Sequence, residues 1–229
     1  IIIWEKGANG KYEVKETLKS HTGVIRTLQV LPDGRIVSGS SDKTIIIWEK
    51  GANGEYKIKE TLEGHTDQIH TLQVLPDGRI VSGGYDGCIK IWEKGNDGKY
   101  KTIETLEENL DAVLTLQVLT DDEIVSGTHN GTIKIWKKET NSKYKAKETL
   151  EGHTDQVNTL QVLPDGRIVS GSSDKTIIIW EKGANGKYEV KETLEGHTDQ
   201  VNTLQVLPDG RIVSGSSDKT IIIWEKGAN

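Results

Sequence analysis

Six tryptophans recur at one fixed interval in this chain of 229 residues, and that interval restricts the possible folds more than any other feature. They are Trp4, Trp48, Trp92, Trp136, Trp180 and Trp224, each 44 residues after the one before. Five near-identical units begin at Lys11, Glu55, Lys99, Lys143 and Lys187, and residues 1–10 are the tail of a preceding unit. A fixed period of this length is typical of repeat architectures, in which each copy is one structural unit.

Each unit contains four short apolar segments that are separated by turn residues. In the last unit they are Tyr188–Leu194, Val201–Leu207, Ile212–Gly215 and Thr220–Trp224. The chain has no Phe or Met, so its core must use Val, Ile, Leu and Trp, and β-branched residues favour strands. The connecting sequences LPDG, SSDK and EKGANG supply the Pro, Gly, Asn and Asp that turns require.

Four strands per unit predict an all-β fold, namely a β-propeller of four-stranded antiparallel blades. A single blade cannot cover both of its faces, so blades must stack around a common axis. We therefore expect residues 1–229 to form one propeller domain, with five 44-residue repeats and an extra N-terminal strand.

Two ways of closing the ring stay open at this point. Tyr12–Leu18 could pair beside Thr220–Trp224 and close a five-bladed ring, or the chain could be an arc of a larger ring, which we favour. An arc has bare edges and blade faces, and these predict homo-oligomers formed by ring closure or strand exchange.

Three short patterns in the units point to a family. They are a Gly-His pair before the second strand, a Ser-x-x-x-Asp spacing from the third strand and a closing Ile-Trp; the Gly-His pairs are Gly64-His65, Gly152-His153 and Gly196-His197. Over its whole length the chain resembles the WD-repeat family, although the family's final Trp-Asp is Trp-Glu here, as at Trp48-Glu49. The highly identical repeats also resemble the sensor propellers attached to signal-transducing NTPases in bacteria and fungi. The resemblance implies a rigid scaffold for a protein or peptide partner, with no enzyme activity.

Histidine, serine, aspartate and tryptophan recur together in four of the five units. The sets are His21, Ser38, Asp42 and Trp48; His65, Ser82, Asp86 and Trp92; His153, Ser170, Asp174 and Trp180; and His197, Ser214, Asp218 and Trp224. Nucleophilic catalysis needs one such triad beside one substrate pocket, whereas this set is repeated. The resemblance implies instead a structural relay, in which Trp180 donates to Ser170, Ser170 meets His153, and His153 meets Asp174. We therefore expect no catalytic residues.

The third unit departs from this pattern. Asn109 replaces the histidine and Asn130 replaces the aspartate, while Ser126 and Trp136 remain. Asparagine can donate and accept hydrogen bonds, but we expect this blade to be the least stable.

The few differences between units predict where a partner binds. Units one and five differ only between Lys19 and Arg26, and unit two departs mainly at its inter-blade loop and its SSDK-type hairpin. Alternate connections of an antiparallel meander emerge on the same side, so these two segments share a face. The predicted contact residues are Val24, Arg26, His70, Tyr85, Leu114, His129, Asn158, Ser173, Asn202 and Ser217. Arg26, His70 and Tyr85 are preferred, because Arg and Tyr are enriched at interface hot spots.

Two alternatives to this interpretation stay open. The differences could be drift after duplication, although drift would scatter over both faces and the changes of unit one do not. A lectin-like propeller that binds glycans with every blade is the second alternative. It would need exposed aromatic side chains that repeat in each unit.

Composition narrows the partners further. The net charge of −6 argues against nucleic acid and anionic membranes, and no apolar run approaches the roughly 20 residues that span a bilayer. The single cysteine, Cys88, rules out an internal disulfide, and no signal peptide is visible, so we expect a cytoplasmic protein. No motif for a cofactor or metal is present; we expect His70 and His129 to be ordinary surface residues and Cys88 to be a packed thiol.

Overall fold

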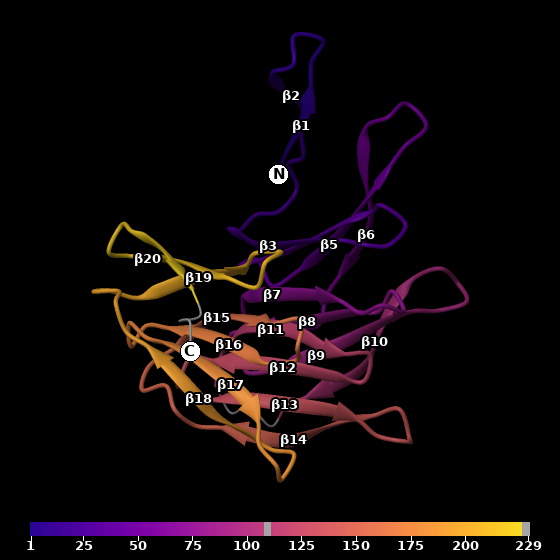
Figure 1. Ribbon diagram of the computed structural model, residues 1–229. Coiled ribbons are helices and arrows are strands. Elements are labelled where there is room, and N and C mark those ends of the chain that lie inside the picture. Colours follow the sequence, from indigo (N-terminus) through magenta and orange to yellow (C-terminus); the bar gives the residue numbers. More distant parts are fainter. Residues whose placement is uncertain (108–110, 226–229) are drawn as a thin grey trace.

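The computed structural model describes residues 1–107 and 111–225, and the regular structure of these residues consists of strands (Figure 1). No helix that could cross a membrane occurs among them. The strands form antiparallel sheets in which neighbours along the chain are neighbours in the sheet. This is the all-β arrangement of four-stranded blades that the repeat predicts.

Four sheets contain four strands each. Blade 1 is β3 (Ile25–Val30), β4 (Ile36–Ser40), β5 (Ile45–Lys50) and β6 (Tyr56–Leu62), and blade 2 is β7 (Ile69–Val74), β8 (Ile80–Gly84), β9 (Ile89–Lys94) and β10 (Tyr100–Leu106). Blade 3 is β11 (Val113–Thr120), β12 (Glu123–Thr128), β13 (Ile133–Lys138) and β14 (Tyr144–Leu150), and blade 4 is β15 (Val157–Val162), β16 (Ile168–Ser172), β17 (Ile177–Lys182) and β18 (Tyr188–Leu194). Each blade takes its outermost strand from the start of the following sequence unit.

The two ends of the chain form incomplete sheets. Blade 5 has three strands, β19 (Val201–Val206), β20 (Ile212–Ser216) and β21 (Ile221–Trp224). At the other end, β1 (Ile2–Lys6) and β2 (Tyr12–Thr17) form a hairpin that projects from the body (Figure 1). β2 therefore pairs with β1 and not with β21, and the five-bladed closure through Tyr12–Leu18 is not the arrangement observed.

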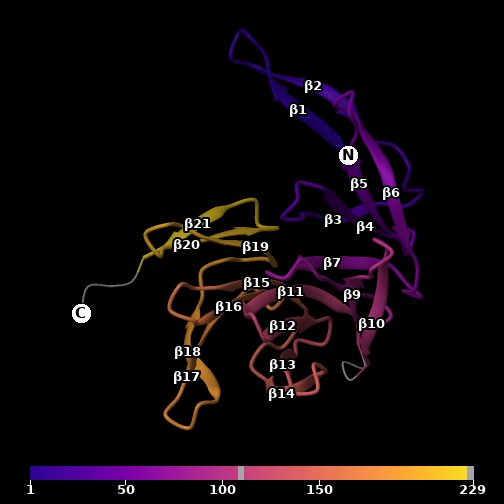
Figure 2. The ribbon, with the colours of Figure 1, turned by 90° about the vertical axis from the view of Figure 1, so that its right-hand side faces the viewer.

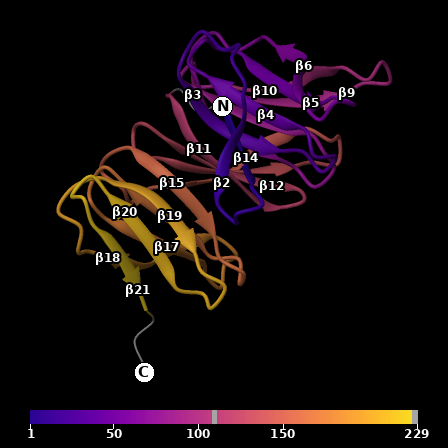
Figure 3. The same cartoon turned by 90° about the horizontal axis from the view of Figure 1, so that it is seen from above.

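The blades fan out as an arc, with blade 1 and blade 5 at its ends (Figures 2 and 3). Apolar side chains from facing blades fill the spaces between them; Val81 and Ile91 of blade 2, for example, pack with Leu116 and Trp136 of blade 3. At the ends the same positions are bare. Leu28 of blade 1 is 48% exposed and Ile221 of blade 5 is 75% exposed, whereas the equivalent Leu72 is 1% and Ile45 is 0% exposed.

Polar side chains also link each blade to the next. A glutamate near the end of each outer strand accepts the backbone N–H of the tyrosine that begins the next outer strand, at 2.7 to 3.1 Å; the pairs are Glu16–Tyr56, Glu60–Tyr100, Glu104–Tyr144 and Glu148–Tyr188. On the inner strands, Gln29 Nε2 donates to the carbonyl of Leu72 at 3.1 Å, and Gln73 repeats this contact with Leu116 at 2.9 Å. Neither set of links is among the features predicted from the sequence.

One glycine of each second strand is required by this close packing. A Cβ on Gly171 would lie 2.7 Å from Cγ1 of Val201 in the next blade and 2.9 Å from Cγ2 of Thr159 in its own blade. At Gly215, in the blade at the end of the described arc, the same Cβ would meet only the Thr203 methyl, at 2.9 Å. Gly171 and Gly215 therefore differ only in the contact with a residue of the next blade.

We predict that Gly171→Ala lowers the free energy of unfolding by about 1–3 kcal/mol, because the added methyl group overpacks the interface between blades 4 and 5. Gly215→Ala is the matched control and is expected to cost clearly less. Urea denaturation of both variants measures the difference. Equal losses would show that the neighbouring blade does not impose the glycine.

Candidate functional site

One side of the arc is built from the inter-blade loops and the hairpins between the second and third strands of the blades. We call it the loop face; the described residues of its loops are 19–24, 63–68, 107, 111–112, 151–156 and 195–200, and its hairpins are residues 41–44, 85–88, 129–132, 173–176 and 217–220. In each blade the first N–H of the hairpin donates to a loop carbonyl at 2.8 to 3.0 Å; the pairs are Ser41–Val24, Tyr85–Gln68, His129–Ala112, Ser173–Gln156 and Ser217–Gln200. The two predicted segments thus share one face.

The predicted contact residues come together in pairs on this face. Except for Val24, each of these residues lies either near the start of an inner strand or at the first position of a hairpin. The two positions of one blade are 15 residues apart. Together with Ser41, they give the pairs Arg26/Ser41, His70/Tyr85, Leu114/His129, Asn158/Ser173 and Asn202/Ser217. Four of these pairs are in direct contact. The same backbone positions therefore carry different chemistry in successive blades.

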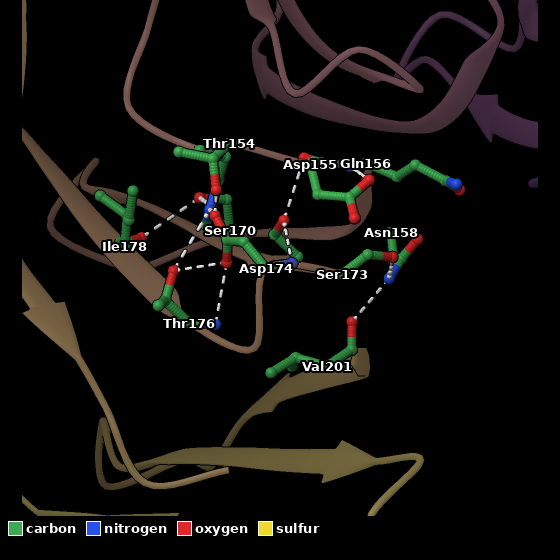
Figure 4. A network of polar contacts seen from close by, with 12 residues as sticks. Thr154, Asp155, Gln156, Asn158, Ser170, Ser173, Asp174, Thr176, Ile178 and Val201 are labelled. Atoms are coloured by element: carbon green, nitrogen blue, oxygen red, sulfur yellow. Dashed lines mark hydrogen bonds and ion pairs between the residues drawn. The ribbon is translucent and has the colours of Figure 1, made fainter. Parts of the chain in front are cut away.

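In blades 4 and 5 the asparagine and serine of the pair are hydrogen-bonded to each other. Asn158 Nδ2 donates to Ser173 Oγ and to the carbonyl of Val201 in the next blade, both at 3.0 Å (Figure 4). Asn202 Nδ2 donates to Ser217 Oγ at 2.8 Å. Ser173 is only 7% exposed, so it offers a partner little surface, contrary to its place in the predicted contact set.

In blade 1 the pair forms a polar cluster that reaches the next blade. Arg26 Nε donates to Ser41 Oγ at 3.0 Å, and Arg26 Nη2 donates to Gln68 Oε1 at 3.3 Å. Ser41 Oγ also donates to Gln68 Oε1, at 2.9 Å. Sequence reasoning missed Ser41, because units four and five carry serine at the same position, and it missed Gln68. Val24 beside them is 61% exposed.

In blades 2 and 3 the pairs carry aromatic rings. The rings of His70 and Tyr85 lie 4.7 Å apart between centroids, and Tyr85 and His129 lie 6.4 Å apart in an edge-on arrangement. Tyr85 remains 40% exposed. Burial, reinforced by the positive charge of Arg26, lowers the pKa of His70 to about 4, so its imidazole is neutral at neutral pH. Leu114, half-buried, lies at the equivalent position of blade 3.

Beneath the loop face, the recurrent polar residues form a chain of hydrogen bonds. In blade 4, Trp180 Nε1 donates to Ser170 Oγ at 2.8 Å, Ser170 Oγ lies 2.7 Å from His153 Nε2, and His153 Nδ1 lies 2.7 Å from Asp174. Asp174 also accepts the N–H of Thr154, at 3.0 Å (Figure 4). Blades 1, 2 and 5 repeat these contacts with their own residues. The chain of bonds ties the inter-blade loop to two strands.

The serines of this relay are enclosed. Ser38, Ser82, Ser170 and Ser214 are 0% exposed, and their oxygens are already held by a tryptophan on one side and a histidine on the other. The carboxylates are held equally firmly. Burial by itself raises the pKa of Asp86, but hydrogen bonds from His65 and from the N–H groups of Thr66 and Cys88 outweigh this and lower it to about 2. The geometry suits a fixed structural network, because nothing can reach the serine oxygen.

Blade 3 keeps half of the relay. Trp136 Nε1 donates to Ser126 Oγ at 2.9 Å, and Asn130 accepts bonds from the Thr128 hydroxyl and the N–H of Thr132. Asn109 lies outside the described residues. Asn130 thus organises its own hairpin, and the lower stability expected for this blade stays a prediction.

The sequence pattern of the family described as WD domain, G-beta repeat matches five segments, at residues 12–49, 56–93, 100–137, 144–181 and 188–225. The chain belongs to the WD-repeat family. A solved structure described as the WD40 beta propeller domain of Doa1 is similar at a TM-score of 0.76 and 29% sequence identity. The match covers 91% of this chain and 66% of that chain, so this WD-repeat chain spans about two thirds of that structure's length. The curated proteins contain no match.

Two other kinds of reactive group bear on the chemistry of this WD-repeat chain, namely metal-binding clusters and the thiol of Cys88. Among the described residues no cluster of three or more His, Cys, Asp or Glu side chains could hold a metal ion. Cys88 is half-buried with its Sγ 3.6 Å from the carbonyl oxygen of Asp86, and burial raises the pKa of its thiol. These surroundings do not activate the thiol.

We predict that His153→Ala lowers the free energy of unfolding by about 1–3 kcal/mol, because the buried Ser170 hydroxyl and the Asp174 carboxylate each lose a partner. His129→Ala, which removes an exposed histidine of the same face from outside the relay, is expected to cost less than about 0.5 kcal/mol. Thermal and urea unfolding compare the two variants. A loss for His153→Ala as small as that of the control would contradict a structural role for the relay.

Proposed function

We propose that this chain is a non-catalytic scaffold that binds a protein or peptide through its loop face. The observation that carries the proposal is where the repeats differ. The paired loop-face positions hold Arg26, His70, Tyr85 and His129 in the first three blades, whereas blades 4 and 5 hold the same Asn-Ser pair. The strands that form the blade cores remain nearly constant. A rigid framework with varied loops is how scaffolds usually carry binding sites.

Enzyme activity is not part of this proposal, because the histidine, serine and aspartate that could suggest it are sealed into the relay. We also propose that the protein works in the cytoplasm, since a single half-buried thiol at Cys88 suits a reducing compartment. Nucleic acid and membranes are not the proposed partners, because the net charge is −6.

The binding proposal is tested by selecting peptides from a displayed library against the whole chain. We expect the selected peptides to lose most of their affinity for the variant Arg26→Ala/His70→Ala/Tyr85→Ala, since it removes the preferred contact side chains. The matched control is Glu93→Ala/Asn96→Ala/Lys99→Ala, which changes exposed residues at the opposite end of blade 2. Peptides that bind both variants alike, or that depend on the control residues, would defeat the proposal.

The lectin alternative has less support. Its repeated aromatic side chains would have to be exposed in every blade, but Tyr100, Tyr144 and Tyr188 of the outer strands are only 3–7% exposed, whereas Tyr12 of the end hairpin is 70% exposed. A glycan array run on the same protein separates the two functions, because glycan binding that survives the triple variant would favour the lectin.

We also propose that copies of the chain associate through the bare faces of blades 1 and 5. Leu28 and Ile221 are apolar and exposed there, although their equivalents are buried at every internal interface. Large exposed apolar faces are rare in monomers and commonly mark contact surfaces.

Sedimentation velocity is expected to show assembly that grows with protein concentration. Ile221→Lys should suppress this assembly, because a charge on the open face opposes its burial. Ile103→Lys is the control; Ile103 is 47% exposed on an outer strand far from both ends. A monomer at all concentrations, or equal behaviour of the two variants, would overturn this proposal.

A further inference from the structure

Two kinds of substitution coincide on the loop face of blades 2 and 3. Where blades 1, 4 and 5 have serine at the first hairpin position, these blades have Tyr85 and His129. Where blades 1, 4 and 5 have lysine two residues later, these blades have Gly87 and Gly131. At these hairpin positions the two blades thus gain aromatic rings and lose lysine, while Lys90 and Lys134 stand in their third strands where the other blades have isoleucine.

The rings form a continuous, open platform. Tyr85 stands in the middle, with His70 on one side and His129 on the other, at the ring distances of 4.7 and 6.4 Å given above. The Tyr85 hydroxyl and the nitrogens of both imidazoles make no side-chain hydrogen bond to any described residue, unlike the Asn-Ser pairs of blades 4 and 5. The platform therefore has free polar atoms and a 40% exposed tyrosine.

Charges of both signs act on this platform, because Arg26 on the blade 1 side lowers the pKa of His70 more strongly than Asp67 raises it. The negative charge of Asp67 raises the pKa of His70 and so partly opposes the effect of burial. The backbone of Asp111 lies against Gly87. Their loops also carry Glu63 and Glu107, whereas the corresponding loop of blade 1 begins with Lys19. Since His70 is neutral at neutral pH, no ring charge of its own offsets these carboxylates.

We propose that the platform of His70, Tyr85 and His129, which we call the aromatic platform, receives a cationic side chain, lysine or arginine, from the protein partner. A cation is attracted to the face of a tyrosine ring, and nearby carboxylates strengthen that attraction. This inference rests on the proposed function and adds to it the chemistry that the partner must present.

Arg26 sets the position of the bound cation. Its guanidinium is held by Ser41 and Gln68 on the blade 1 side of His70. Two like charges repel, so the partner's cation lies on the other side of Tyr85, toward His129 and Asp111. Arg26 itself is then available to an acidic or carbonyl group that precedes or follows the cation in the partner.

The test uses short capped peptides and the whole chain. NMR titration compares acetyl-Gly-Arg-Gly-amide with the same peptide containing citrulline, which has the shape of arginine without its charge. The arginine peptide is expected to shift the ring signals of Tyr85, His70 and His129 saturably, and the citrulline peptide to bind about three- to tenfold more weakly. Equal binding of both, or stronger binding of acetyl-Gly-Glu-Gly-amide, overturns the proposal.

Variants assign the binding to the platform. Tyr85→Ser introduces the residue of blades 1, 4 and 5, and Asp111→Asn removes a negative charge; each should weaken the arginine peptide at least severalfold. Asp155→Asn makes the same change in the loop of blade 4 and should have no effect. Unchanged binding by a folded Tyr85→Ser variant overturns the assignment.

Blade 4 also permits the reverse experiment. Asn158→His/Ser173→Tyr/Lys175→Gly/Ser217→His copies the platform into blades 4 and 5, and a folded variant should bind a second arginine peptide. A folded variant that binds only one would show that these residues do not suffice. If arginine and citrulline peptides bind alike while library peptides still require Arg26, His70 and Tyr85, only the cation assignment fails and the binding face stands.

Discussion

The structure depends on one constraint, which is that each blade has two apolar faces and can cover them only with other blades. Val81 and Ile91 of blade 2 are buried because blade 3 lies against them, and the same holds along the arc. Stability is therefore shared between neighbours, as in other repeat proteins. Leu28 and Ile221 at the two ends of the arc are exposed, whereas the equivalent residues of the other blades are buried under a neighbouring blade. The same constraint therefore accounts for the exposed ends.

This constraint explains why variation collects in the loops. A strand residue of one unit contacts the next blade through its side chain, and Gly171 cannot accept even a methyl group without moving Val201. A loop residue such as Tyr85 meets no such restriction. The relay below the loop then holds the variable side chains in fixed positions, because His153 and Asp174 join the loop to the sheet. A partner that binds there finds a surface that is already ordered.

Local patterns in the sequence predicted most of the fold. The repeat, the turn residues and the alternating strands were sufficient to place a strand at Val201–Leu207, which in the structure is Val201–Val206. The face shared by loops and hairpins followed from the meander alone. The links from Glu60 to Tyr100 and from Gln73 to Leu116 were missed, because they are alike in most units and a comparison of units shows only differences.

Other features depend on the neighbouring blade and not on the residue. Ser173 is buried and Ser217 is exposed, although both stand in the same local sequence, because a blade follows the first and none follows the second in this chain. Ring closure also depends on how neighbouring blades pack. The angle between neighbouring blades decides whether β2 can reach β21. That angle is set by how the side chains of facing blades pack. The spacing of residues along the sequence therefore does not predict the angle between blades.

The lysines of the hairpins show which differences on the loop face the backbone conformation explains. Lys43, Lys175 and Lys219 have φ angles of 71 to 75°, in the left-handed region that favours glycine, and blades 2 and 3 have Gly87 and Gly131 there. Relief of backbone strain alone explains this exchange. It does not explain Tyr85, because the hairpin backbone needs no aromatic ring at this position and a partly exposed ring leaves apolar surface in water. The proposal of a partner site on blades 2 and 3 therefore rests on the aromatic platform and not on the loss of lysine.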